Sequence, residues 1–135
     1  MPKRPIPFEF VVEAIETRSP WVRPMFGCFS VYVGDEIVLF LRERDDEIHT
    51  NGVWVATTPA HRESLAAEFF ITRQTLREGE FGSKWLRLPS DHPRFEQDAL
   101  RACELIVARD PRVGHPPSPR KSERKAGGSR PTPGR

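Results

Sequence analysis

RPMFGCFSVYV-GD-EIVLFLR is the sequence of residues 23–42, and this stretch decides the fold. Two runs rich in β-branched and aromatic residues flank the pair Gly34-Asp35. This pattern predicts a β-hairpin, and glycine in the first place favours a type II′ turn. A charged segment follows over residues 42–50, and a third apolar run occupies residues 53–57. The sequence therefore predicts an antiparallel meander of three strands at the centre of the protein.

Helical periodicity appears on both sides of this meander. Apolar residues at positions 8, 11, 12 and 15 recur at i, i+3, i+4 and i+7, which predicts a helix that begins at Pro7 and stops at Ser19-Pro20. A Thr-Thr-Pro start at 57–59 predicts a short helix to about Phe69. A last helix is expected between a cap at Asp91 or His92, of which Asp91 is the better acceptor, and the Asp110-Pro111 pair. Its predicted buried stripe consists of Phe95, Ala99, Ala102, Cys103 and Ile106.

Two further strands are expected between the short helix and the last helix. Residues 74–77 and 84–88 have strand character, and the linker between them contains Gly79 and Gly82, which favours a hairpin. The predicted fold class is α+β. It consists of an antiparallel sheet of about five strands (meander plus hairpin) covered by N-terminal and C-terminal helices, with a short helix after the third strand.

Composition divides the chain into three parts. We expect a flexible lead over 1–6, one folded domain over 7–109, and a disordered basic tail rich in proline, glycine and serine over 110–135. The tail carries seven basic and two acidic residues, a net charge of +5, whereas residues 1–109 carry 14 basic and 17 acidic residues, a net charge of −3. The basic tail therefore stands apart from a mildly acidic body.

The start of the chain shows no apolar core of a signal peptide, and no stretch is apolar enough to span a membrane. We therefore expect a cytoplasmic protein. In that compartment Cys28 and Cys103 are expected to be free thiols, buried as small hydrophobic side chains.

The segment Arg23-x-Met25-Phe26-Gly27 resembles the start of the sheet in the N-terminal domain of the TfoX/Sxy family. In that family an Arg-x-Met-Phe-Gly segment follows the first helix and begins the sheet, and the order of elements matches from about Pro7 to Arg109. The resemblance implies a non-catalytic regulatory domain that acts through protein partners. Family members implicated in competence regulation carry a second, helical domain, for which we expect no room here.

Few residues fall into patterns that carry chemistry. Four histidines, at positions 49, 61, 92 and 115, lie far apart, so no zinc site is expected. Consecutive acids at 45–47 favour a solvated loop over a calcium site. The pair Gly79-x-x-Gly82 lacks the lysine of a phosphate loop, and no Gly-x-Ser-x-Gly elbow exists. We therefore expect no cofactor, no metal and no catalytic residue.

Several residues are candidates for contacts with a partner. Arg23 is expected either to bind an anion or to pair with a helix acid. Met25 and Phe26 are expected in the core, and Gly27 at a point of close approach between elements. Three tryptophans could form a platform for single-stranded nucleic acid with three basic residues, the alternative being core packing beside a solvated strand face. These residues are Trp21, Trp54, Trp85, Arg77, Lys84 and Arg87.

Three functions remain open from the sequence. The first is a non-catalytic regulatory or adaptor domain that acts through an unknown protein partner. The second is a nucleic-acid-associated protein whose tail contacts phosphates without sequence preference. The third is a small-molecule-binding or enzymatic domain with a pocket between sheet and helices. The tail residues expected to contact nucleic acid are Arg120, Lys121, Arg124 and Lys125.

Overall fold

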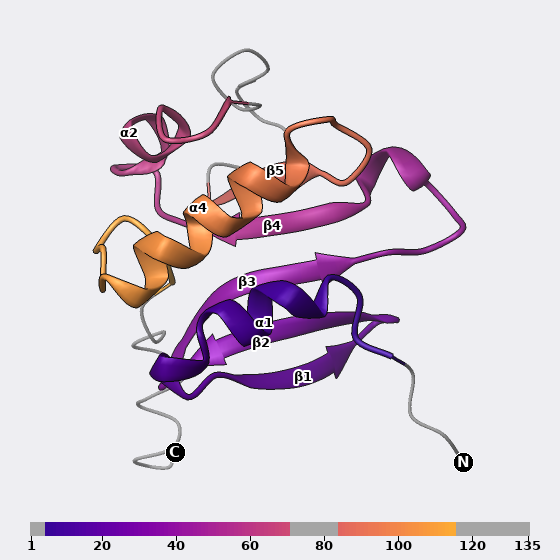
Figure 1. The fold of residues 1–135 in the computed structure, drawn as a ribbon, viewed down its shortest axis with the longest axis horizontal. Coiled ribbons are helices and arrows are strands. Elements are labelled where there is room, and N and C mark those ends of the chain that lie inside the picture. Colours follow the sequence, from indigo (N-terminus) through magenta and orange to yellow (C-terminus); the bar gives the residue numbers. More distant parts are fainter. Residues whose placement is uncertain (1–4, 71–83, 116–135) are drawn as a thin grey trace, which may run out of the picture.

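The computed structural model describes residues 5–70 and 84–115. The chain forms one antiparallel sheet whose five strands follow each other in chain order (Figure 1). The strands are β1 (Trp21–Met25), β2 (Cys28–Val33), β3 (Glu36–Arg42), β4 (Gly52–Ala56) and β5 (Trp85–Pro89). The helices are α1 (Glu9–Ala14), α2 (Arg62–Ala66) and α4 (Phe95–Val107), with short 3-10 turns η1 (Glu16–Arg18) and η2 (Ile48–Thr50). The predicted α+β fold with an antiparallel sheet is confirmed.

The first strand of the sheet was not predicted. Residues 21–25 form β1, which pairs with β2 so that Met25 lies opposite Cys28. Phe26 and Gly27 are the two turn residues between them, with φ of 54° and 78°. Positive φ at both positions is the pattern of a type I′ turn, which matches the twist of a hairpin. The tripeptide Met25-Phe26-Gly27 therefore ends one strand and turns into the next, and does not open the sheet.

The prediction that Phe26 lies in the core is wrong. Its side chain is 90% exposed, because it stands at the tip of the turn beyond the last strand pair. Gly27 was expected at a close approach of elements, but its positive φ assigns it to the turn instead. Met25 is partly buried at the end of β1.

The hairpin predicted at Gly34-Asp35 is confirmed. Val33 pairs with Glu36, so the loop has two residues, and Gly34 has φ of 60° while Asp35 is outside the positive region, as in a type II′ turn. The pairing of β2 with β3 shifts by one residue after Val31, because Val38 is an extra residue on β3. This bulge explains the continuous apolar run 37–41: Val38 and Leu39 both join the core.

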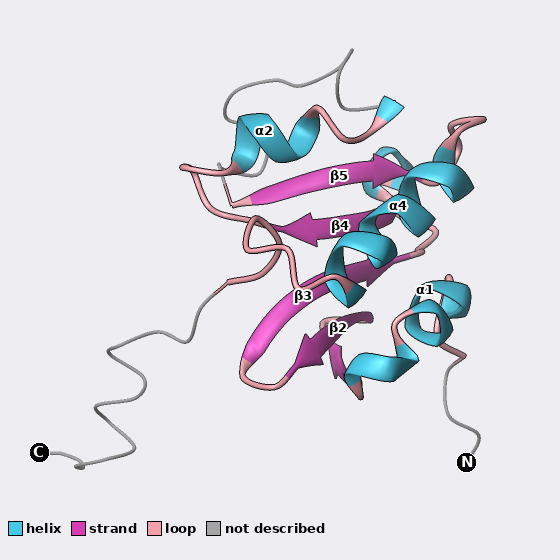
Figure 2. Ribbon diagram, turned by 60° about the vertical axis from the view of Figure 1, so that its left-hand side comes forward, coloured by secondary structure: helices cyan, strands magenta, loops and turns pink. Residues whose placement is uncertain are grey.

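The core lies between one face of the sheet and the helices (Figure 2). Helices α1 and α4 lie side by side over that face, while α2 lies near β5 (Figures 1 and 2). The predicted stripe of the last helix is buried in full, and so are Val11, Ile15, Leu65 and Phe69. The strands contribute alternate residues to the same cluster: Phe29, Val31, Leu39, Leu41, Val53, Val55, Leu86 and Leu88. Cys28 and Cys103 are free and buried, as predicted.

Several predicted boundaries are wrong. Helix α1 begins at Glu9 after Phe8, whose φ of 54° places it outside the helix, and does not begin at Pro7. Helix α4 begins after Arg94 without a side-chain cap, so Asp91 does not cap it. The short helix follows the fourth strand because β1 precedes the others. The strand predicted over 74–77 lies outside the described residues.

The predicted limits of the domain are also too narrow. Ile6 packs against the core, although it was assigned to the flexible lead. Residues 110–115 were assigned to the disordered tail, but Val113 is buried and the backbone N–H of Gly114 donates to Ala56 O at 2.8 Å. His115 forms an isolated bridge with Ile37. Residues 110–115 therefore belong to the folded body. They were not predicted because backbone pairing beyond the last helix leaves no periodic pattern in the sequence.

Candidate functional site

The two faces of the sheet differ sharply. The face away from α1 and α4, called the distal face below, takes the alternate residue of each strand, because directly paired residues point to the same side. Five of its members are aromatic and three are arginines. By strand register it consists of Trp21, Arg23, Met25, Cys28, Ser30, Tyr32, Ile37, Phe40, Arg42, Gly52, Trp54, Ala56, Trp85, Arg87 and Pro89.

One cross-strand row runs the full width of the distal face. Each residue of the row is paired directly with the next, from β1 to β5, and an arginine stands at each end. The row is Arg23, Ser30, Phe40, Trp54 and Arg87. Arg23 and Arg87, two predicted contact residues from distant segments of the chain, thus belong to one surface.

These two arginines have different surroundings. Arg23 is exposed, and its side chain makes no hydrogen bond or ion pair within residues 5–70 and 84–115, so the expected pair with a helix acid is not found there. Arg87 is partly buried, and its Nη1 donates to Asn51 O at 3.4 Å. Lys84 is exposed directly before β5, whereas Arg77 lies outside the described residues.

The aromatic side chains of the distal face are not equally accessible. Trp21 is 48% exposed and stacks on Tyr32 with ring centroids 4.2 Å apart and planes 10° apart. Phe40 and Trp85 are partly exposed and meet edge to face at 6.1 Å. Trp54 is only 7% exposed, and its indole N–H donates to Thr50 O at 3.1 Å. The three tryptophans therefore share one face, as the platform alternative requires, but Trp54 forms the buried floor of that face.

A groove of about 500 Å³ follows these residues across the sheet. That volume falls within the usual range of ligand sites. Its walls are mainly apolar or aromatic, with polar side chains at one end. The lining residues are Met25, Ser30, Ile37, Phe40, Arg42, Glu47, Thr50, Trp54 and Trp85.

Charge on the distal face is one-sided. None of the strand residues assigned to it is acidic, although Glu47 of the loop after β3 lines one end of the groove. Arg42 is committed to that loop: its guanidinium donates to Glu47 O at 3.2 Å and to Asn51 Oδ1 at 2.6 Å. Arg87 already donates to Asn51 O, so Arg23 is the arginine of the distal face best placed to meet an anion, and Lys84 is exposed directly before β5.

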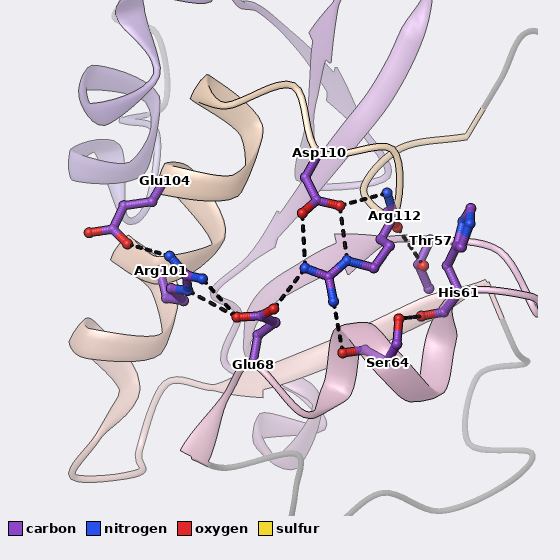
Figure 3. Close-up of polar contacts among 8 residues, drawn as sticks. All are labelled: Thr57, His61, Ser64, Glu68, Arg101, Glu104, Asp110 and Arg112. Carbon is purple, nitrogen blue, oxygen red and sulfur yellow. Dashed lines mark hydrogen bonds and ion pairs between the residues drawn. The ribbon is translucent and has the colours of Figure 1, made fainter.

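A second polar cluster holds the end of the body together (Figure 3). Arg112 Nη2 lies 2.7 Å from Glu68 Oε2 and 2.9 Å from Asp110 Oδ2, while Nη1 donates to Ser64 O. Arg101 Nη2 reaches the other oxygen of Glu68 at 2.8 Å. Thr57 Oγ1 donates to Arg112 O at 2.7 Å.

The pKa shifts in this cluster follow from its hydrogen bonds. The Arg112 guanidinium lowers the pKa of Asp110 to about 2. Arg101 first, and then Arg112, lower the pKa of Glu68. Each carboxylate is thus held ionised by a cation, so the cluster clamps residues 110–112 to α2 and α4. An acid or base in catalysis would need a proton to exchange, which this arrangement opposes.

A pocket between sheet and helices was expected if the protein bound a small molecule. A hollow of about 360 Å³ lies there, lined in part by Arg18, His61 and Asp110. Arg18 donates to Ile106 O at the end of α4, and Asp110 is paired with Arg112. Five ionisable side chains line the hollow, and two of them, Arg18 and Asp110, are already engaged within the protein. The other three are Glu36, His61 and Arg109.

Other reactive side chains are placed unfavourably for chemistry. Burial raises the pKa of the Cys103 thiol to about 12, so the nucleophilic thiolate is suppressed. Among the residues described, no group of three or more His, Cys, Asp or Glu side chains is placed to hold a metal ion. No helix in the described part of the chain is long and apolar enough to cross a membrane.

Tyr32 and Phe40 were not predicted as members of this surface. Strand alternation would have placed Tyr32 on the same face as Ser30. The bulge at Val38 interrupts the alternation around Phe40, so the sequence pattern did not show the face of that residue. Comparison with protein-family models, with curated proteins and with solved structures returned no significant match. The resemblance to the TfoX/Sxy family therefore stays a prediction.

Proposed function

We propose that this protein is a non-catalytic binding domain of the regulatory or adaptor kind, and that the distal face is its contact surface. The observation that supports this most directly is the row from Arg23 to Arg87, which combines aromatic and cationic groups across five strands. Aromatic residues and arginine are the types most enriched at the energetic centres of interfaces. The opposite face is filled by helices and supplies the stability of the fold.

The rest of the described surface supports a binding role over catalysis. The acids whose pKa is clearly lowered, Asp46, Glu68 and Asp110, are each hydrogen-bonded to an arginine. Both thiols are buried. A protein of this kind would act by binding a particular partner and not by catalysing a reaction. Free cysteines also agree with the cytoplasmic location that we propose.

The test compares what copurifies with three forms of the full-length protein. The surface variant carries Trp21→Ala and Arg23→Glu, two exposed positions of β1. The matched control carries Leu100→Ala and Arg109→Glu, also an exposed apolar residue and an exposed arginine, on and after α4. Thermal melts first establish that all three forms are folded.

We expect partners to be retained by the wild type and the control and depleted about tenfold or more in the surface variant. A tenfold change corresponds to the loss of one contact of about 1.4 kcal/mol. Quantitative mass spectrometry of proteins, with parallel analysis of bound nucleic acid, measures the depletion. If the surface variant retains the same partners in the same amounts, the distal face is not the contact surface and the proposal is wrong.

A further inference from the structure

We infer that the ligand of the distal face is single-stranded nucleic acid, with bases stacked on its aromatic rings and phosphates paired with its arginines. This inference rests on the proposed function and names the ligand class for that surface. It differs from a purely electrostatic role of the tail, because the site is built from the sheet.

The aromatic rings supply the stacking surfaces. Trp21 and Tyr32 form a nearly parallel pair at one side of the face, and Trp21 is half exposed. Phe40 and Trp85 stand across the groove at the other side, both partly exposed. Bases of any identity can stack on such rings, because every base presents a flat π surface. An ordinary strand surface facing water would carry polar residues at these positions.

The basic groups are placed to follow a phosphate backbone. Arg23 on β1 and Arg87 on β5, whose Nη1 already donates to Asn51 O, are separated by four inter-strand spacings, about 19 Å at ~4.8 Å each. Such a span suits the smaller single-stranded sites, which cover ~4 nucleotides and upward. Arg23 is exposed and makes no ion pair with any described residue, so its guanidinium is available to a phosphate.

His115, the last residue that the structure describes before the C-terminus, lies at the rim of the same surface. The ring of His115 lies 4.8 Å from that of Trp85, and its Nε2 donates to Lys84 O at 2.8 Å. The next 20 residues carry six basic residues and one acidic residue, a net charge of +5. Moving the boundary from 109 to 115 leaves this charge unchanged, since Asp110 and Arg112 cancel. A strongly basic segment therefore starts directly beside the aromatic groove.

The surface favours single strands over duplexes. In a duplex the flat faces of the bases are stacked on each other and only their edges are exposed in the grooves. The rings of Trp21 and Trp85 would then have no exposed base face on which to stack. A single strand exposes both base faces and backbone, which are the groups that this face and its rim complement.

The experiment measures fluorescence anisotropy with labelled 15-nucleotide oligo(dT), an oligo(U) of equal length and a duplex of equal length. Full-length wild type is compared with three variants. The stacking variant is Trp21→Ala with Trp85→Ala, and the phosphate variant is Arg23→Ala. The third replaces Arg120, Lys121, Arg124 and Lys125 by glutamine. Leu100→Ala, at an exposed position of α4, is the control.

We expect the single strands to bind more tightly than the duplex. The stacking variant should weaken oligonucleotide binding by about 5- to 100-fold, the range for loss of one stacked base. Arg23→Ala should lower the dependence of log affinity on log salt by about 0.7, and the four tail substitutions by up to about 3. Leu100→Ala should bind as the wild type does.

Three results would overturn the inference. They are no binding of either oligonucleotide at low salt, tighter binding of the duplex, or binding that the tail substitutions abolish while the stacking variant and Arg23→Ala leave it unchanged. If the double tryptophan variant fails to fold, the Arg23→Ala variant alone tests the inference. Its substitution should not affect folding, because the Arg23 side chain makes no hydrogen bond or ion pair with a described residue. If oligonucleotides fail but the copurification test still loses a protein partner with the surface variant, the proposed function stands and only the ligand class is wrong.

Discussion

A substitution of Arg112 tests whether residues 110–115 contribute to the stability of the fold. Arg112→Met removes the guanidinium but keeps an apolar stem of similar length. The wild-type side chain binds two carboxylates and one backbone carbonyl, so three acceptors lose their donor at once. If residues 110–115 were a disordered tail, the substitution would have no effect on stability.

The expected loss in the free energy of unfolding of Arg112→Met lies between two limits. Exposed ion pairs contribute about 0–1 kcal/mol, whereas removing one partner of a buried pair costs about 3–5 kcal/mol. The side chains of Arg112, Asp110 and Glu68 are 21%, 18% and 24% exposed, so the pairs are mostly shielded from solvent. We therefore expect a loss of about 2–3 kcal/mol in the free energy of unfolding. For a domain of this size that lowers Tm by roughly 8–12 °C.

The assay is thermal and urea unfolding of the wild type, Arg112→Met, Glu68→Gln and the double variant. A coupling energy of about 1–2 kcal/mol between Arg112 and Glu68 is expected, because the two side chains form an ion pair with each other. Arg109→Met is the matched control, since Arg109 is exposed and forms no ion pair within the described part of the chain. An Arg112→Met protein that unfolds like the control would refute the clamp.

Acid titration gives the same clamp a second readout. The pKa of Asp110 is lowered to about 2 from an ordinary value of 3.8, so its contribution is complete above about pH 4. It is lost as the pH falls through 2, because the folded state must then take up a proton that weakens the pair. The stability difference between wild type and Arg112→Met should therefore narrow between pH 4 and pH 2. A constant difference across that range would show that the carboxylate is not paired.

Three further outcomes follow from single positions. Phe26→Asn should raise the free energy of unfolding by about 0.5–1 kcal/mol, because asparagine tolerates the positive φ of a type I′ turn; a clear fall in Tm would show that the Phe26 ring makes a stabilising contact and contradict this expectation. Gly52→Ala should destabilise by more than about 2 kcal/mol, since a Cβ there would lie 2.2 Å from Leu88 O; an unchanged urea midpoint would contradict this packing of β4 on β5. Cys103 should resist alkylation at pH 8 until the protein is unfolded, because burial raises the pKa of its thiol to about 12; rapid modification of the native protein, resolved by peptide mass spectrometry, would argue against this.

Local patterns in the sequence were sufficient for the elements whose determinants lie close together in the chain. The 3.6-residue stripe of α4 needs only the spacing of five apolar residues, and all five are buried. The turn at Gly34-Asp35 needs only a glycine between two β-rich runs. The free, buried state of Cys28 and Cys103 likewise followed from composition and context.

Features that depend on partners distant in the chain needed the tertiary structure. Strand β1 was not predicted because its short sequence, with Pro24 within it, gains strand character only by pairing with β2. Phe26 was assigned to the core because an aromatic residue in an apolar run usually is, whereas a two-residue turn places it outside. The same holds for residues 110–115, whose order comes from Arg112, Ala56 and Ile37, contacts made across at least 40 residues of chain.

The candidate surface divides in the same way. The sequence alone shows which basic and aromatic residues are candidates for this surface, and it places them on separate segments: Trp21, Arg23, Trp85 and Arg87. Their common face was decided by strand register, because a shift of one residue turns every side chain of a strand to the other side. The bulge at Val38 is such a shift, and it alone keeps Phe40 and Ile37 on the distal face while Leu39 and Val38 enter the core. Pairing geometry, which no local pattern encodes, thus assembled the surface.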